Sequence, residues 1–128
     1  MDSKLSNRLE VLLNAFREQR PQDLKRLGNE FIGQAAQNND SPLARLSVIA
    51  YSLYKMLSKD HFLRSPQWGT ISQKIETALL DAKTALEKNN RAAFDESLEL
   101  AIKSISGLDR DLSNFAKNIY ENAKIKQA

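Results

Sequence analysis

The sequence SPLARLSVIAYSLYKMLSK, residues 41–59, predicts a helix that is apolar on nearly every side. Ser41 is a residue type that caps helix N-termini, and Pro42 fits the first helical position, where its missing N–H costs nothing. Apolar residues then recur at helical spacing on one face, and others cover the remaining sides. A surface helix keeps a polar face, so neighbours must cover this one on several sides. We therefore expect the central helix of a bundle over about residues 42–58.

The composition favours an all-α fold. The chain has 128 residues, which is enough for one domain with a hydrophobic core. Apolar residues make up 41% and charged residues 27%, as in folded globular proteins. Glycine and proline are rare, whereas the helix-forming residues Ala, Leu, Lys, Glu and Gln are abundant. We expect a five-helix bundle with a long C-terminal helix, in a single domain over residues 1–128.

Several classes of protein are excluded by the residues that the sequence lacks. Without cysteine the chain has no disulfide, no thiolate metal ligand and no thiol nucleophile. The N-terminal residues MDSKLSNRLEVLLNAF carry charges throughout, unlike a secretory signal. The central apolar segment is too short and too interrupted by polar residues to span a bilayer, which needs about 20 apolar residues. We therefore expect a cytoplasmic protein that does not associate with membranes.

Two helices are expected before the central one. The first covers about residues 4–19 and ends at Arg20-Pro21, because a residue before proline is pushed out of helical geometry. The second covers about residues 22–37 and contains Gly28 and Gly33. Each glycine costs about 1 kcal/mol of helix stability relative to alanine. Either the close approach of a neighbouring helix or chance explains these two glycines.

Two more helices are expected after a connection that contains His61. Ser65-Pro66 repeats the serine–proline pair of the central helix, so a long helix is expected over about residues 66–88. Asn89-Asn90 then makes a short break, and the last helix begins at about residue 91. Because the connection is short and polar, the two helices should form an antiparallel hairpin.

The last helix carries apolar residues at a period of 3.5, which is typical of helices that pack along a seam. These residues are Phe94, Leu98, Ala101, Ile105, Leu108, Leu112, Phe115 and Ile119. The unbroken phase favours one helix that continues across Gly107, and the alternative is a new helix capped by Asp109.

The end of this helix is a candidate interaction surface. A continuous helix would pass well beyond the preceding one, so its apolar stripe needs another cover. That cover is either the first two helices or a second molecule, with Leu108, Leu112, Phe115 and Ile119 as the interaction residues. The final residues KIKQA contain no helix-stop residue, so we expect the natural chain to continue beyond Ala128.

A second candidate surface is a cluster of cations at the turn between the first two helices. Arg17, Arg20, Lys25 and Arg26 surround that turn. Such a cluster can bind phosphates or an acidic partner, although a solvated helix end is the more common role of such cations. The net charge of +3 and the pI near 9.2 permit contact with nucleic acid but are also ordinary for solubility.

Residue patterns for catalysis are missing. His61 is the only histidine, and its place beside Phe62 is typical of a loop anchored by packing. The sequence has no glycine-rich phosphate loop, no serine elbow and no carboxylate–histidine spacing for a di-iron site. Tyr51, Tyr54 and Trp68 fall at core-like positions. We therefore expect no enzyme activity, no catalytic or metal-binding residues and no cofactor.

Three segments carry a family resemblance: LGNEFIGQAA at residues 27–36, LSVIAYSLYKMLSK at residues 46–59 and NAKIKQA at residues 122–128. Together they resemble a group of uncharacterised small archaeal helical proteins whose chains continue into a helix-turn-helix segment. The resemblance implies an N-terminal helical module that assembles or docks, joined to a nucleic-acid-binding tail. It carries no functional residue over to this chain.

The function expected from the sequence is a non-catalytic interaction or oligomerisation module, the N-terminal part of a DNA-associated archaeal protein. The first alternative is direct, weak nucleic-acid binding through the basic tip, and a distant one is an enzyme. An interaction module predicts an apolar surface, a nucleic-acid binder a continuous positive face, and an enzyme a polar cleft with convergent groups.

Overall fold

A computed structural model describes residues 3–38 and 41–106 of the chain, and within these ranges the protein is helical without any strand. The predicted all-α bundle is thus confirmed. The described helices are α1 (Ser3–Arg17), α2 (Pro21–Asn38), α3 (Ser41–Leu57), α4 (Asp60–Leu63), α5 (Trp68–Glu87) and α6 (Arg91–Ser106).

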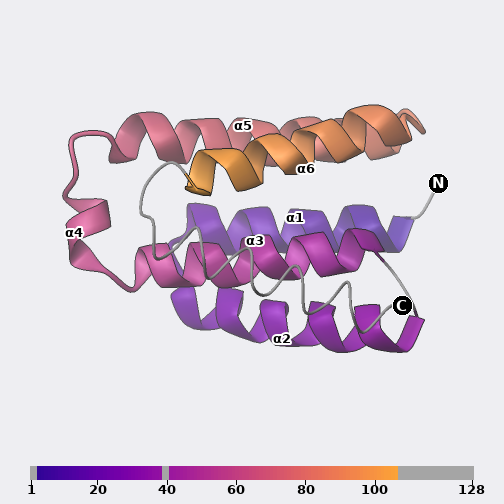
Figure 1. Ribbon diagram of the computed structural model, residues 1–128, viewed down its shortest axis with the longest axis horizontal. Helices are drawn as coiled ribbons and strands as arrows, with labels where there is room; N and C mark the ends of the chain where they lie inside the picture. The colour runs from indigo at the N-terminus through magenta and orange to yellow at the C-terminus, as the bar shows by residue number, and fades with distance from the viewer. Residues whose placement is uncertain (1–2, 39–40, 107–128) are drawn as a thin grey trace.

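The helices form two hairpins with α1 between them (Figure 1). The α2–α3 hairpin lies on one side of the bundle, and the α5–α6 hairpin lies on the other. Helix α1 packs against α2 and α3 as well as α5, whereas α3 also reaches α6. One hydrophobic core therefore runs through both hairpins, and α1 and α3 join them.

Helix α3 is the buried centre that its sequence predicted. It contacts α1, α2, α4 and α6, so apolar neighbours surround it on several sides. Leu46, Ile49 and Leu53 have no exposed surface, and the small polar residues Ser47 and Ser52 are equally buried. The helix begins at the predicted Ser41-Pro42 pair and ends at Leu57.

The turn between α1 and α2 is closed by a left-handed residue. Gln19 has a φ of 53°, and its N–H donates to the Phe16 carbonyl at 3.1 Å. The N–H of Arg20 donates to the Ala15 carbonyl at 3.0 Å. This paired pattern caps the end of a helix and reverses the chain. The structure places the end of α1 at Arg17, two residues before the predicted end at residue 19.

A left-handed residue with the same hydrogen-bond pattern closes the α5–α6 hairpin. Asn89 has a φ of 57°, and the N–H of Asn90 donates to the Ala85 carbonyl at 2.8 Å. The Asn90 side chain then accepts from the Ala93 N–H at 3.1 Å and so caps the start of α6. The predicted break at Asn89-Asn90 is confirmed, and each asparagine has a distinct role in it.

The start of α5 differs from the prediction by two residues. The N–H groups of Gln67 and Trp68 donate to the side chain and the carbonyl of Ser65, at 3.2 Å and 3.0 Å. Ser65-Pro66 therefore makes a turn, and helical geometry begins at Trp68. The short helix α4 was not predicted, because four residues are too few to show a helical period.

The glycines of α2 have different reasons to be there. A Cβ at Gly28 would lie 3.0 Å from the Tyr51 ring, so glycine permits the close approach of α2 and α3. The Gly28 carbonyl also accepts a buried hydrogen bond of 3.0 Å from the Ser47 hydroxyl. A Cβ at Gly33 would meet nothing within 4 Å, so close approach does not explain that glycine.

Candidate functional site

Helix α6 divides into a core face and an outer face. The predicted seam residues Phe94, Leu98, Ala101 and Ile105 are all buried, as their 3.5-residue period indicated. The outer face carries an unexpected apolar residue, Leu100, of which 55% is exposed. Single exposed leucines are common on protein surfaces, so the surroundings of Leu100 decide whether it matters.

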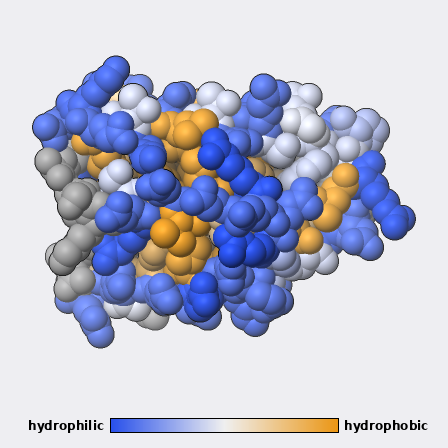
Figure 2. Space-filling model, turned by 180° about the vertical axis from the view of Figure 1, so that it is seen from behind, coloured by the Kyte–Doolittle hydropathy of each residue, from blue (hydrophilic) through white to orange (hydrophobic). Residues whose placement is uncertain are grey.

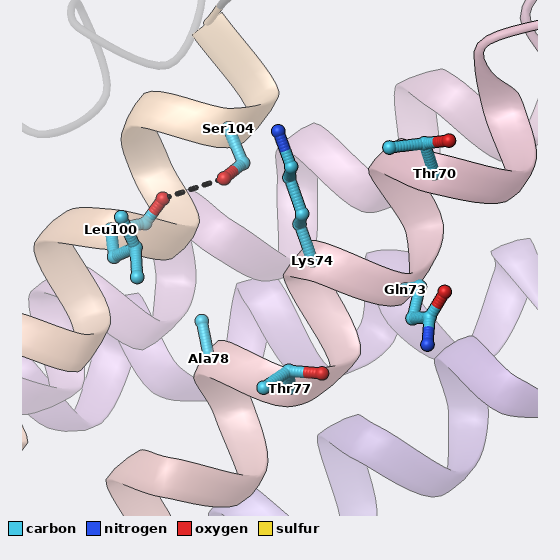
Figure 3. Close-up of a pocket in the computed structure, with 7 residues that line it drawn as sticks. All are labelled: Thr70, Gln73, Lys74, Thr77, Ala78, Leu100 and Ser104. Atoms are coloured by element: carbon cyan, nitrogen blue, oxygen red, sulfur yellow. Dashed lines mark hydrogen bonds between the residues drawn. The ribbon is translucent and has the colours of Figure 1, made fainter.

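Leu100 borders a groove between α5 and α6 with a volume of about 520 Å³ (Figure 3). Leu100 and Ala78 lie on opposite sides of the groove, and the Ser104 hydroxyl donates to the Leu100 carbonyl at 2.9 Å. That bond satisfies the hydroxyl within its own helix. The residues that line the groove are Thr70, Gln73, Lys74, Thr77, Ala78, Leu100 and Ser104.

The chemistry of this groove is suited to binding a side chain. Ala78, Leu100 and the threonine methyl groups give it apolar walls, and Lys74 is the one ionisable side chain among the described residues that line it. A groove with apolar walls and a polar rim is typical of sites that accept an amphipathic helix. Among the described residues that line the groove, none is a histidine or a carboxylate.

A second hollow of about 290 Å³ lies on the other side of Leu100, toward α3. Here the Arg45 guanidinium donates to the Asp95 carboxylate at 3.0 Å, and Arg91 lies 3.7 Å from the same oxygen. These charges join α3 to the start of α6. Glu96, Glu99 and Lys103 complete the lining, so Leu100 is a ridge between an apolar groove and a charged hollow.

The basic tip predicted from the sequence is divided among several partners. Arg17 pairs with Glu76 of α5, whereas Lys25 lies over the Tyr54 ring of α3, 5.6 Å from its centroid. These two cations therefore reach toward different helices.

The other two cations of the tip share one carboxylate. Arg20 and Arg26 both pair with Asp23, at 3.2 Å and 3.4 Å, and Arg20 also pairs with Glu18. Asp23 thus neutralises part of the charge that the sequence placed at the turn. The structure leaves a cluster in which each cation has a protein partner.

The interaction residues predicted at the chain's end, Leu108, Leu112, Phe115 and Ile119, lie outside the described residues. The continuity of the last helix across Gly107 lies outside them as well. Within the described part, the stripe is core and not surface, and the exposed apolar residue is Leu100 on the opposite face.

Tyr51, Tyr54 and Trp68, which were expected at core-like positions, are only partly buried. Trp68 and Tyr54 pack against the core, and the Trp68 and Phe16 rings meet edge to face with centroids 6.1 Å apart. Tyr51 donates a hydrogen bond to the Asn29 side chain. Burial raises the pKa of Tyr51 above its ordinary value, so the phenol stays neutral and serves as a hydrogen-bond donor.

The described residues form neither a metal site nor a membrane-spanning helix. In this part of the chain, no group of three His, Cys, Asp or Glu side chains is placed to hold a metal ion. None of the described helices combines the length and the apolar character needed to cross a bilayer.

The surface opposite the view of Figure 1 shows separate apolar patches among hydrophilic side chains (Figure 2). The large apolar residues with the most exposure in the described part are Val11 on α1, Leu80 on α5 and Leu100 on α6. Of these three, Leu100 alone lines the groove between α5 and α6.

Sequence reasoning missed the Leu100 surface, although a signal was present. Leu100 lies two residues after Leu98 and therefore falls off the seam that the period defines. An apolar residue off the seam of an amphipathic helix is a candidate for surface contact.

Comparison of the chain with protein-family models, curated proteins and solved structures gave no match. The resemblance to archaeal helical proteins therefore stays a prediction.

Proposed function

We propose that this protein is a non-catalytic helical interaction module that binds a partner helix along the groove between α5 and α6. The observation that carries the proposal is the exposed Leu100 side chain beside a groove of about 520 Å³ with apolar walls. An apolar ridge next to an apolar hollow can interdigitate with a partner of the same kind, which removes both from water.

The rest of the bundle supports this role as a rigid scaffold. The face of α6 opposite Leu100 is locked in the core through Phe94, Leu98, Ala101 and Ile105. The Asn89-Asn90 turn and the Arg45–Asp95 hydrogen bond hold α6 against α5 and α3. A docking face that is already ordered loses little conformational entropy when a partner binds.

We place this module in the cytoplasm and, from the resemblance, in a DNA-associated archaeal protein. In this proposal the α5–α6 face assembles or docks, and recognition of DNA belongs to a further C-terminal segment. The groove supports the docking part, because the described residues of its lining include a single cation and so offer little to a phosphate backbone.

Site-specific photo-crosslinking in the native cells tests the proposal. A photoreactive residue at Gln73, in the groove, should form an adduct with a protein partner. The same residue at the exposed Gln22 of α2 is the positional control and should not form that adduct.

A matched pair of substitutions makes the experiment specific. Leu100→Glu should abolish the Gln73 adduct because it places a charge in the apolar contact. Leu80→Glu changes another exposed leucine of the same hairpin outside the groove and should leave the adduct intact. If Gln73 gives no adduct, or if Leu100→Glu leaves the adduct unchanged, the proposed function is wrong.

A further inference from the structure

The outer face of α6 carries an ordered pattern of charge around Leu100. Glu96 and Glu99 precede Leu100, and Lys103 follows it, all on the face that lines the charged hollow. Within the described part of the chain, none of these three charges is in an ion pair. The stripe is therefore acidic toward the start of α6 and basic toward its end.

This charge order is complementary to itself in the antiparallel direction. At a rise of about 1.5 Å per residue, Glu96 lies about 6 Å before Leu100 along the helix axis, and Lys103 about 4.5 Å after it. If a second copy of α6 crosses antiparallel at Leu100, Glu96 of each copy faces Lys103 of the other to within about 1.5 Å along the axis. Side chains of this length easily span that offset.

We infer that the partner that docks on the Leu100 face of the α5–α6 hairpin is a second copy of this chain, packed with its α6 antiparallel to the first across a twofold axis near Leu100. This inference rests on the proposed function and names the partner. A twofold contact needs the ridge and the hollow on one surface, because the same patch serves on both copies. Leu100 and the groove beside it meet that requirement.

The charges also exclude the other orientation. A parallel pair of α6 helices would place Glu96 beside Glu96 and Lys103 beside Lys103. Like charges face to face oppose association, and Glu99 lies near Glu99 in either orientation, but only the antiparallel pair gives two Glu96–Lys103 contacts. The contact centres on a single apolar residue, so it belongs to the small and transient class of interfaces.

Sedimentation equilibrium on the purified full chain tests the inference. The wild type should pass from monomer to dimer as concentration rises to about 500 µM, which is the range of weak association. Leu100→Glu should stay monomeric at every concentration, and Leu80→Glu should associate as the wild type does. Circular dichroism should show unchanged helicity in both variants, because both leucines are on the surface.

A charge exchange tests the antiparallel arrangement itself. The double variant Glu96→Lys/Glu99→Lys makes the stripe wholly basic, and Lys103→Glu makes it wholly acidic. Each variant alone should dimerise at least about tenfold more weakly than the wild type, because like charges now face each other. A mixture of the two should form a heterodimer about as tight as the wild-type dimer, and 1 M salt should reduce these differences.

The possible results separate this inference from the proposed function. A chain that stays monomeric at about 500 µM, or charge variants that fail to associate with each other, would overturn the second copy as occupant. A Gln73 adduct to a different protein, or to residues 107–128 of the same chain, would overturn it too. The adduct to a different protein would still uphold the interaction module.

Discussion

The Arg45 guanidinium of α3 donates a 3.0 Å hydrogen bond to the Asp95 carboxylate of α6, across the boundary between the two helical hairpins. Only 19% of the Arg45 side chain is exposed, and its Nε is buried without a partner in the described residues. The Nη1 group of the same guanidinium is the one that donates to Asp95. This contact joins the core scaffold to the helix that carries Leu100.

Substitutions of Arg45 and of Asp95 should lower the free energy of unfolding by different amounts. Asp95→Ala leaves the partly buried guanidinium without this acceptor and should lower the free energy of unfolding by about 1 kcal/mol, a value that allows for solvent screening at Asp95. Arg45→Met removes the unpartnered Nε together with the ion pair. It should therefore lower the free energy of unfolding by less than Asp95→Ala does. Arg91→Gln, at the exposed partner, should stay within about 0.5 kcal/mol of wild type. Urea unfolding measures all three, and an Arg45→Met loss larger than that of Asp95→Ala would contradict this account.

Truncation of buried side chains in the central helix α3 should lower the free energy of unfolding substantially. Ile49 and Leu53 have no exposed surface and lie among residues from several helices. Ile49→Ala or Leu53→Ala should each lower the free energy of unfolding by about 2–5 kcal/mol, because the surrounding core cannot fill the cavity. Val11→Ala, at a site 50% exposed, is the matched control and should change stability little. Thermal melts in which all three variants match the parent would show that α3 is not the centre of the core.

The two buried serines of α3 provide a sharper comparison. The Ser47 hydroxyl donates to the Gly28 carbonyl at 3.0 Å, whereas the Ser52 hydroxyl has no partner among the described residues. Ser47→Ala should therefore destabilise the protein by about 1 kcal/mol, and Ser52→Ala should stabilise it by about 1 kcal/mol by removing an unsatisfied buried group. Because both substitutions have the same helix propensity effect, the sign of their difference in denaturant midpoint is decisive.

The glycines of α2 should also respond in different ways. Gly33→Ala adds a methyl group in open space and should stabilise the helix by about 1 kcal/mol. Gly28→Ala brings the same gain in propensity but forces a contact of 3.0 Å with the Tyr51 ring, so its free energy of unfolding should be lower than that of Gly33→Ala. Equal stabilisation by both substitutions would show that the Tyr51 ring moves aside with no loss in the free energy of unfolding.

Much of the fold follows from local sequence, because helical period, proline and asparagine act over a few residues. The seam from Phe94 to Ile105 and the break at Asn89-Asn90 were predictable for that reason. The start of α5 was not, because Ser65-Pro66 is equally suited to a helix start and to the turn that the Ser65 hydrogen bonds make.

The candidate site depended on relations between distant parts of the chain. Arg17 and Glu76 are separated by 59 residues, and no local pattern pairs them. The groove beside Leu100 likewise depends on the spacing between α5 and α6, where Thr77 and Ala78 are too small to fill the gap. Sequence alone identifies charged and apolar side chains, and packing decides which of them remain available to a partner.

The basic tip gives the last prediction, which concerns the alternative of nucleic-acid binding. Arg17, Arg20 and Arg26 pair with carboxylates, so each must give up a protein partner before it binds a phosphate. We therefore expect this chain to retard double-stranded DNA only weakly and at low salt. The slope of log K against log salt should be about −1, which corresponds to the release of about one counterion.

A substitution at Asp23 tests this prediction, because its carboxylate pairs with both Arg20 and Arg26. Asp23→Asn should free Arg26 and leave Arg20 paired with Glu18 alone, so it should strengthen DNA binding and steepen the salt slope. Arg20→Glu/Arg26→Glu should abolish what binding there is. Gel retardation and fluorescence anisotropy at several salt concentrations measure these changes. Tight wild-type binding with a slope near −4 would mean that the tip's cations abandon their carboxylates for DNA, and nucleic-acid binding would then replace helix docking as the function of this chain.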